Sequence, residues 1–188
     1  MLYIVNHSHD PYFNMAVEEY LLYELELSEH YLTLWQNRPT VVVGRNQNTW
    51  DEVNLEFIKE HNVAVVRRLT GGGAVYHDQG NLNFTFIFKN QKKCNYDFAR
   101  FMSPVVDALK RLGLPATIDG RNDITINGKK VSGNSQYRRK DRVIHHGTLL
   151  FDVNLDNLEK SLKVSRDKLS KRGVSSVRSR VINIRELL

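Results

Sequence analysis

Residues 67–83 read Arg67-Arg68-Leu69-Thr70-Gly71-Gly72-Gly73-Ala74-Val75-Tyr76-His77-Asp78-Gln79-Gly80-Asn81-Leu82-Asn83. Three adjacent glycines remove every Cβ from one short loop, so the backbone can take positive φ values and approach a ligand closely. Successive bare N–H groups can form a concavity that binds an anion, and the two arginines add positive charge with bidentate donors. The stretch predicts a phosphate site, although a tight turn with surface arginines would use the same glycines.

The segments on both sides of the glycines are expected to be extended. A β-branched run at residues 63–66 leads into the arginines, and a second apolar run at residues 84–88 follows the loop. The loop is not a P-loop, because no Gly-Lys-Ser/Thr follows it. It is not a dinucleotide fingerprint either, because a strand rather than a helix is expected after the glycines.

Further motifs follow in order: Gly-Arg-Asn-Asp-Ile at 120–124, Lys-Val-Ser-Gly at 130–133 and His-His-Gly-Thr-Leu at 145–149. Together with Arg-Arg-x-x-Gly-Gly-Gly-x-Val-x-His-Asp-x-Gly-Asn, they resemble the lipoate–protein ligase A family over most of the chain. The resemblance implies an α/β (α+β) fold of the biotin/lipoate ligase catalytic-domain type, similar to class II aminoacyl-tRNA synthetases. Such a fold has mixed, mainly antiparallel sheets with flanking helices, and residues 1–188 would form one such domain.

Length and composition set outer bounds on the function. With 188 residues and 41% hydrophobic content, the chain can form one domain with its own core. No apolar run approaches the roughly 20 residues that a membrane span needs. The single cysteine, Cys94, fits a reducing compartment, which predicts a cytoplasmic protein. The net charge of +6 indicates an anionic partner: a nucleotide, a nucleic acid or an acidic protein surface.

Short extended runs between turn residues predict most of the strands. The expected strands are residues 2–5, 31–36, 40–43, 63–68, 74–77, 82–88, 116–119, 123–126, 129–132 and 143–153. The three strands around the glycine loop are expected to form a meander. Asn127-Gly128 is a strong hairpin signal, because this pair suits a type I′ turn.

Four helices are expected, the first beginning at Pro11 and the others at residues 51–60, 98–112 and 155–162. Asp10 and Asp51 would cap the first two helices, and Gly113 would end the third. Pro104 inside the third helix predicts a kink, or a second start with Ser103 as its cap.

The resemblance also implies a reaction. ATP would convert the carboxylate of lipoate into a mixed anhydride, lipoyl-adenylate, with release of pyrophosphate. Two anions meet in that step, so the site needs positive charge and oriented donors. Lys130 matches the family lysine that contacts both substrates and is the implied catalytic residue, although an isolated lysine usually faces solvent. Its neighbour Lys129 should point to the opposite face of the strand.

The implied ligand contacts come from the same motifs. ATP and the adenylate would contact Arg68, Gly71, Gly72, Gly73, Ala74, Val75, Tyr76, His77, Asn81, Asn122, Asp123 and Lys130. Lipoate would contact Arg68, Gly72, His77, Lys130 and His146. Asp123 is also the candidate Mg²⁺ ligand, but it could equally cap a turn, and His77 could be a satisfied structural histidine. The loop at residues 44–48 would lie at the edge of the acyl pocket, which Trp35 could line.

Other functions remain as alternatives. Octanoyltransferases share the fold but use an acyl-thioester on a cysteine beyond the Lys-Val motif, whereas Cys94 precedes Lys130 and no cysteine follows it. The glycine-arginine-rich loop of biotin ligases is absent. A transferase without full activation activity remains possible, as does a non-catalytic nucleotide- or nucleic-acid-binding module, which residues 138–142 and the basic tail after Lys163 suggest. Such charge runs are usually solvated faces, so a nucleic-acid partner is not expected.

The resemblance implies partners as well. The acceptors would be lipoyl domains of 2-oxoacid dehydrogenase subunits or the H protein of the glycine cleavage system. Such acceptors are typically acidic in the family, so a basic surface would speed their encounter. ATP, Mg²⁺ and lipoate are the implied small molecules, and no membrane partner is expected. Residues 174–184 resemble a segment inside the longer ligases, so we expect the end of the large domain and an accessory domain to be missing here.

Overall fold

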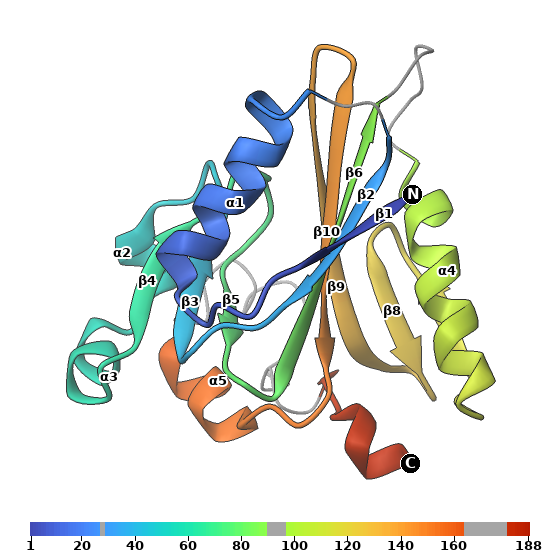
Figure 1. Cartoon of the computed structure of the whole chain (residues 1–188). Coiled ribbons are helices and arrows are strands. Elements are labelled where there is room, and N and C mark those ends of the chain that lie inside the picture. The colour runs from blue at the N-terminus through green and yellow to red at the C-terminus, as the bar shows by residue number, and fades with distance from the viewer. Residues whose placement is uncertain (27–28, 90–96, 164–179) are drawn as a thin grey trace.

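The computed structural model describes residues 1–26, 29–89, 97–163 and 180–188. Within these ranges, ten strands form one large and one small sheet, with helices on their flanks (Figure 1). Most neighbouring strands run antiparallel, so the predicted α/β class with mixed, mainly antiparallel sheets is confirmed. No helix of the described residues is both long enough and apolar enough to cross a membrane.

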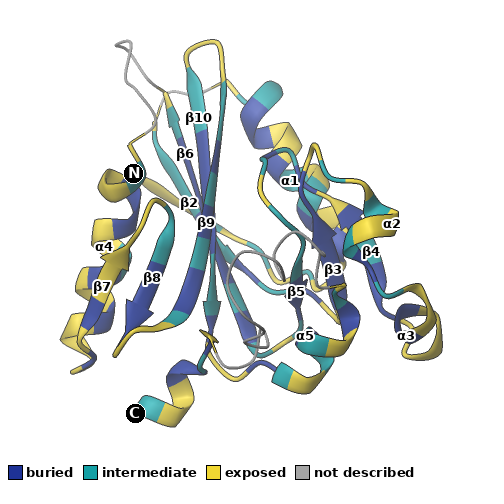
Figure 2. Cartoon of the chain, turned by 180° about the vertical axis from the view of Figure 1, so that it is seen from behind, coloured by how far each residue is buried: buried dark blue, intermediate teal, exposed yellow. Residues whose placement is uncertain are grey.

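The large sheet has seven strands. Their order is β1 (Leu2–Val5), β2 (Tyr31–Trp35), β6 (Asn81–Lys89), β10 (Arg142–Leu150), β9 (Lys129–Arg139), β8 (Asp123–Ile126) and β7 (Ala116–Asp119). Only β1 and β2 pair in parallel among these neighbours. The long strands β6 and β10 lie at the centre, with Thr85 opposite His146. The central strands are largely buried, whereas much of the outer helical surface is exposed (Figure 2).

The small sheet corrects the expected meander. Its order is β4 (Ala64–Arg67), β3 (Thr40–Val43) and β5 (Val75–His77), with β3 parallel to β4 and antiparallel to β5. The glycine loop passes over the end of β3, where Arg68 N–H donates to Val43 O and Arg45 N–H donates to Thr70 O. β4 and β5 therefore lie on opposite sides of β3, and β6 belongs to the large sheet.

The helix expected at residues 51–60 is two helices, α2 (Thr49–Glu52) and α3 (Leu55–Glu60). Val53 breaks them apart because it takes an extended conformation, with φ −118° and ψ 132°, and forms an isolated bridge to Leu162. Its side chain is fully buried. Each short helix therefore has its own cap, Asn48 and Asn54, and the expected cap at Asp51 is wrong.

The other helices agree better with the predictions made from the sequence. Helix α1 (Pro11–Tyr23) has Asp10 as its cap, as predicted. Helix α4 (Phe98–Arg111) includes Pro104 without a second start, so the cap expected at Ser103 is wrong; that hydroxyl instead donates to Ala99 O. Gly113 follows α4 with a φ of 84°, which suits the predicted stop. Helix α5 (Leu155–Ser161) and a short 3₁₀ helix (Ile184–Leu187) complete the described chain.

The Asn127-Gly128 hairpin is confirmed, with positive φ values of 52° and 75° at the two turn residues. Strand β9 is longer than expected and extends to Arg139. A register shift occurs between Ile124 and Thr125, which pair with Ser132 and Lys130 on β9. This bulge sets the position of Lys130 on the hairpin arm.

Strands β6 and β10 separate an aromatic layer from a polar one, because successive side chains alternate between the two faces. Phe84 packs with Phe101 of α4, and His145 stacks on Phe101 with 4.9 Å between ring centroids. On the opposite face, Thr85 and His146 both contact the carboxylate of Glu18 in α1. The centre of the sheet therefore presents a polar surface toward α1.

The turn before β6 connects the two sheets. Gly80 in this turn lies so close to another backbone segment that there is no room for a side chain. Its carbonyl accepts the N–H groups of Phe151 and Asp152, which follow β10. A Cβ on Gly80 would lie 1.9 Å from the carbonyl oxygen of Asp152. The backbones of residues 80 and 151–152 can approach this closely only without a Cβ.

We expect Gly80→Ala to lower the free energy of unfolding by more than about 2 kcal/mol, because backbone atoms rather than a flexible side chain must move. Gly113→Ala is the matched control. A Cβ at this position would meet no atom within 4 Å, so the variant is destabilised only by the positive φ, at a cost of roughly 1–2 kcal/mol. Urea denaturation of both variants measures the difference, and equal losses would contradict the packing argument.

Candidate functional site

A cavity of about 470 Å³ lies between the polar face of the large sheet and the glycine loop. Its walls come from both sheets, from α1 and from α4. The lining residues include Met15, Trp35, Arg68, Gly71, Gly72, Gly73, Ala74, Val75, His77, Asn83, Asn122, Lys130, Gly133, Asn134, Ser135, His146 and Thr148. Segments far apart in the sequence thus meet at one site.

Arg68 shapes the glycine loop from inside. Its guanidinium donates to the carbonyl oxygens of Val42, Gly71 and Gly73 at 3.1, 2.7 and 2.9 Å, and to Thr70 Oγ1 at 3.1 Å. Burial lowers the pKa of Arg68 to about 10, while the carboxylates of Glu18 and Glu52 oppose that shift. The guanidinium therefore stays charged at neutral pH, and most of its hydrogen bonds hold the glycine loop.

Arg67 has a similar role outside the cavity. It donates to the carbonyl oxygens of Gly44 and Gln47 and to Thr49 Oγ1, so it holds the loop at residues 44–48. That loop lies against the glycines, since a Cβ on Gly44 would be 1.8 Å from Gly72 O. The expectation that both arginines face a phosphate is therefore wrong for Arg67, whose side chain is fixed by this loop.

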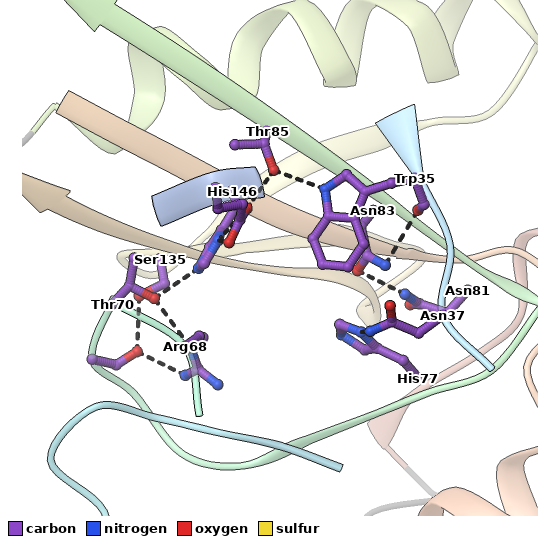
Figure 3. Close-up of polar contacts among 12 residues, drawn as sticks. Trp35, Asn37, Arg68, Thr70, His77, Asn81, Asn83, Thr85, Ser135 and His146 are labelled. Carbon is purple, nitrogen blue, oxygen red and sulfur yellow. Dashed lines mark hydrogen bonds and ion pairs between the residues drawn. The ribbon is translucent and has the colours of Figure 1, made fainter. Parts of the chain in front are cut away.

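A chain of polar contacts connects Thr85 and His146 of the large sheet with Thr70 and Arg68 (Figure 3). The carboxylate of Glu18 accepts from Thr85 Oγ1 at 2.6 Å and lies 2.9 Å from His146 Nδ1. The other ring nitrogen, His146 Nε2, lies 2.7 Å from Thr70 Oγ1. Through Thr70, this chain ends on Nε of Arg68. A buried carboxylate on α1 is thus connected to the buried guanidinium that holds the glycine loop.

His77 lines the cavity on the side of β5. It is 3% exposed, and its Nδ1 lies 3.2 Å from Asn37 Nδ2. Its Nε2 has no hydrogen-bond partner among the described residues. Burial, together with the nearby Arg68 and His146, lowers the pKa of His77 to about 3, so its ring is neutral at physiological pH.

Lys130 enters the cavity from the hairpin arm of β9. Its Nζ forms an ion pair with Asp123 Oδ1 at 2.8 Å, and its side chain is half-buried, whereas Lys129 is exposed. Gly133 leaves room for this lysine, because a Cβ there would be 3.0 Å from Lys130 Nζ. Asn122 is held by Asn134, through bonds to its amide and its carbonyl.

Most residues expected at the site therefore come together, but three do not line the cavity. The Tyr76 side chain is buried in the core cluster that contains Val41 and Leu158. Asn81 is buried and donates to Asn83 Oδ1. Asp123 reaches the site only through Lys130. Cys94 and most of the basic tail, including Arg166 to Arg178, lie outside the described residues.

Sequence reasoning missed several lining residues on β6, β9 and β10. Asn83, Asn134, Ser135 and Thr148 line the cavity, and with the register known, strand alternation places Asn83, Ser135 and Thr148 on the face of His146. Trp35 lines the cavity as suggested, and its indole donates to Thr85 Oγ1 at 2.9 Å. The sequence does not show which strands pair with each other. It therefore could not connect these side chains with the site.

Comparison with known proteins is consistent with this geometry. Residues 10–188 match the lipoyl protein ligase A/B catalytic domain family. The chain is 47% identical over its full length to lipoate-protein ligase LplJ of Bacillus subtilis and covers 57% of that protein. The chain spans about half the length of the curated relatives it matches.

Solved structures of lipoate ligases superpose closely. The bipartite lipoate protein ligase of the archaeon Thermoplasma acidophilum, studied with its E2 lipoyl domain, has a TM-score of 0.86 at 29% identity, covering 98% of this chain and 74% of that one. LipL1 of P. falciparum in complex with lipoate has a TM-score of 0.82 at 34% identity, with coverages of 99% and 56%.

A lipoate-protein ligase A bound with ATP gives a TM-score of 0.84 at 28% identity, covering 100% of this chain and 76% of that one. The family match extends over residues 10–188, which is nearly the whole chain. The chain therefore belongs to the lipoyl protein ligase A/B catalytic domain family.

Proposed function

We propose that this chain uses ATP to activate lipoate as lipoyl-adenylate and transfers the lipoyl group to a lysine of an acceptor lipoyl domain. One observation carries the proposal: Lys130 lines the same cavity that the bare glycine loop and the buried Arg68 border. An ammonium group and close-packed backbone thus face one space large enough for a small ligand. The similar proteins that bind lipoate or ATP support the same choice of substrates.

In the first step, a carboxylate oxygen of lipoate attacks the α-phosphorus of ATP. The bond between that phosphorus and the bridging oxygen breaks, and pyrophosphate leaves with the electron pair. Lys130 would neutralise charge that both anions bring together, and its ion pair with Asp123 supports this role because it holds the ammonium group. The glycine loop, held in shape by Arg68, offers its backbone to the nucleotide.

In the second step, the amine of the acceptor lysine attacks the carbonyl carbon of the adenylate. The carbon–oxygen bond to the phosphate breaks, AMP leaves with the electron pair, and the amine loses a proton. Because negative charge develops on the carbonyl oxygen and then on AMP, a fixed cation at the same position serves both steps. Lys130 would therefore act twice without moving far.

Mg²⁺ would enter with the phosphates of ATP and shield their charge. No acidic side chain of the described residues lines the cavity, and the candidate ligand Asp123 already holds Lys130 through one oxygen. A half-exposed carboxylate of this kind fits the usual pattern of one or two protein carboxylates plus phosphate oxygens. Asp123 would be that protein ligand.

The proposed acceptors are lipoyl domains of 2-oxoacid dehydrogenase subunits or the glycine cleavage H protein. The net charge of +6 suits an acidic acceptor, since complementary charge raises the rate of encounter. The related archaeal ligase was studied with an E2 lipoyl domain, which supports the same class of partner. A single cysteine is consistent with a cytoplasmic setting for the reaction.

We expect Lys130→Ala to reduce ATP–pyrophosphate exchange in the presence of lipoate by roughly 100-fold or more, as for loss of a charged group that stabilises a transition state. Lys129→Ala is the matched control, because the neighbouring lysine is exposed, and it should retain exchange. Supplying lipoyl-adenylate with an acceptor domain tests the second step separately. Equal losses in both variants would refute the role of Lys130.

We expect Gly72→Val to abolish ATP binding measured by calorimetry. Gly72 has a φ of 98°, and its Cβ would lie 2.8 Å from a guanidinium nitrogen of Arg68, so either the guanidinium that holds the loop or the loop itself must shift. Gly71→Ala, whose Cβ meets nothing within 4 Å, should lose far less affinity. Unchanged ATP affinity in Gly72→Val would mean that the glycines serve only the turn.

A further inference from the structure

Helix α1 carries two buried polar side chains, Asn14 and Glu18, that the proposed reaction does not use. They are four residues apart, so they lie on one face of the helix, and each is 1% exposed. The polar contacts of each one lead to a different histidine of the cavity, Asn14 through Asn37 to His77, and Glu18 directly to His146. Their hydrogen bonds decide where those histidines carry their protons.

The orientation of the Asn14 amide is set by backbone carbonyls. One atom of this amide lies 2.9 Å from Gln36 O and 3.1 Å from Ser8 O, and carbonyl oxygens only accept, so that atom must be nitrogen. The same nitrogen lies 2.8 Å from the amide of Asn37, which must therefore present its oxygen. Asn37 consequently turns its nitrogen away from Asn14.

That nitrogen faces His77. Asn37 Nδ2 can only donate, so His77 Nδ1 accepts at 3.2 Å, and the single proton of the neutral ring must be on Nε2. Nε2 is buried without a partner among the described residues, and His77 lines the cavity. A buried donor that is left unpaired is costly, so this N–H is suited to a ligand that brings an acceptor.

The contacts of Glu18 place the proton of His146 on Nδ1, the opposite ring nitrogen to the one protonated in His77. The indole N–H of Trp35 donates to Thr85 Oγ1 at 2.9 Å, so the hydroxyl proton of Thr85 is free to go to Glu18, 2.6 Å away. Glu18 then accepts from His146 Nδ1 at 2.9 Å, which places a proton on that nitrogen. His146 Nε2 is left to face the hydroxyl of Thr70 at 2.7 Å.

We propose that Asn14 and Glu18 make α1 a positioning element that places the protons of the two cavity histidines on opposite ring nitrogens. His77 then offers Nε2–H to an anionic oxygen of the ligand, and His146 holds Thr70 and, through it, the Arg68 clamp. The ligand in this inference rests on the proposed function. The anionic oxygen belongs to the carboxylate of lipoate or to a phosphate of the nucleotide.

Nitrogen-15 NMR of histidine-labelled protein without ligand tests the proton positions directly. We expect His77 to be protonated at Nε2 and His146 at Nδ1. Asn37→Asp replaces the donor that faces His77 by an acceptor of the same shape, so His77 should gain a proton at Nδ1 while His146 stays unchanged. Nδ1 protonation of His77 in the parent chain, or no change in Asn37→Asp, would overturn the inference.

Variants of Glu18 test the other branch. Glu18→Gln keeps an acceptor oxygen and should preserve the proton at Nδ1 of His146, whereas Glu18→Ala should lose that preference. Glu19 is the matched control, because it is exposed on the same helix, and Glu19→Gln should leave both histidine signals in place. A His146 spectrum that is the same in Glu18→Ala as in the parent chain would contradict the role of Glu18.

Titration with lipoate alone and with ATP alone identifies the oxygen that His77 binds. A shift of the His77 Nε2–H signal with one ligand assigns the carboxylate or the phosphate, and Asn37→Asp should bind that ligand roughly 10- to 100-fold more weakly. Binding by calorimetry without any His77 shift would overturn the donor role. If neither ligand binds, the proposed function fails, while the spectra of the free protein still decide the proton positions.

Discussion

The charged guanidinium of Arg68 is the group on which the shape of the site depends. It is buried, and it donates to carbonyl oxygens from β3 and from both ends of the glycine loop. Buried charges are tolerated only when they are paired and hydrogen-bonded, and Glu18 supplies the opposite charge at the far end of the Thr70–His146 chain. These bonds restrict a loop of three glycines, whose residues themselves restrict the backbone little.

The same requirement explains the polar interior. A buried carboxylate on α1 needs donors, and β6 and β10 provide them from Thr85 and His146, which face α1 because they are opposite each other in the sheet register. The neighbouring residues on the other face, Phe84 and His145, pack against α4 instead. The large sheet thus has one face that forms an aromatic core and one that forms the cavity wall.

Two of the cations that line the cavity, Arg68 and Lys130, have different environments. Arg68 is buried and donates to four acceptors that hold the glycine loop, and it also lines the cavity. Lys130 is half-exposed and forms a single ion pair, with Asp123. An arginine is suited to a fixed, forked set of acceptors, and a lysine to a mobile point charge.

The sequence alone determined the glycine loop, the Asn127-Gly128 turn, the cap at Asp10 and the family, because these depend on local backbone chemistry and on residues in a fixed order. Tertiary structure decided the rest. The extended conformation of Val53, the division of β4, β5 and β6 between two sheets, and the use of Arg67 as a loop clamp all arise from contacts between segments distant in sequence. Local propensities are weak next to burial and long-range hydrogen bonding, so no pattern within one segment could reveal which partner each residue would meet.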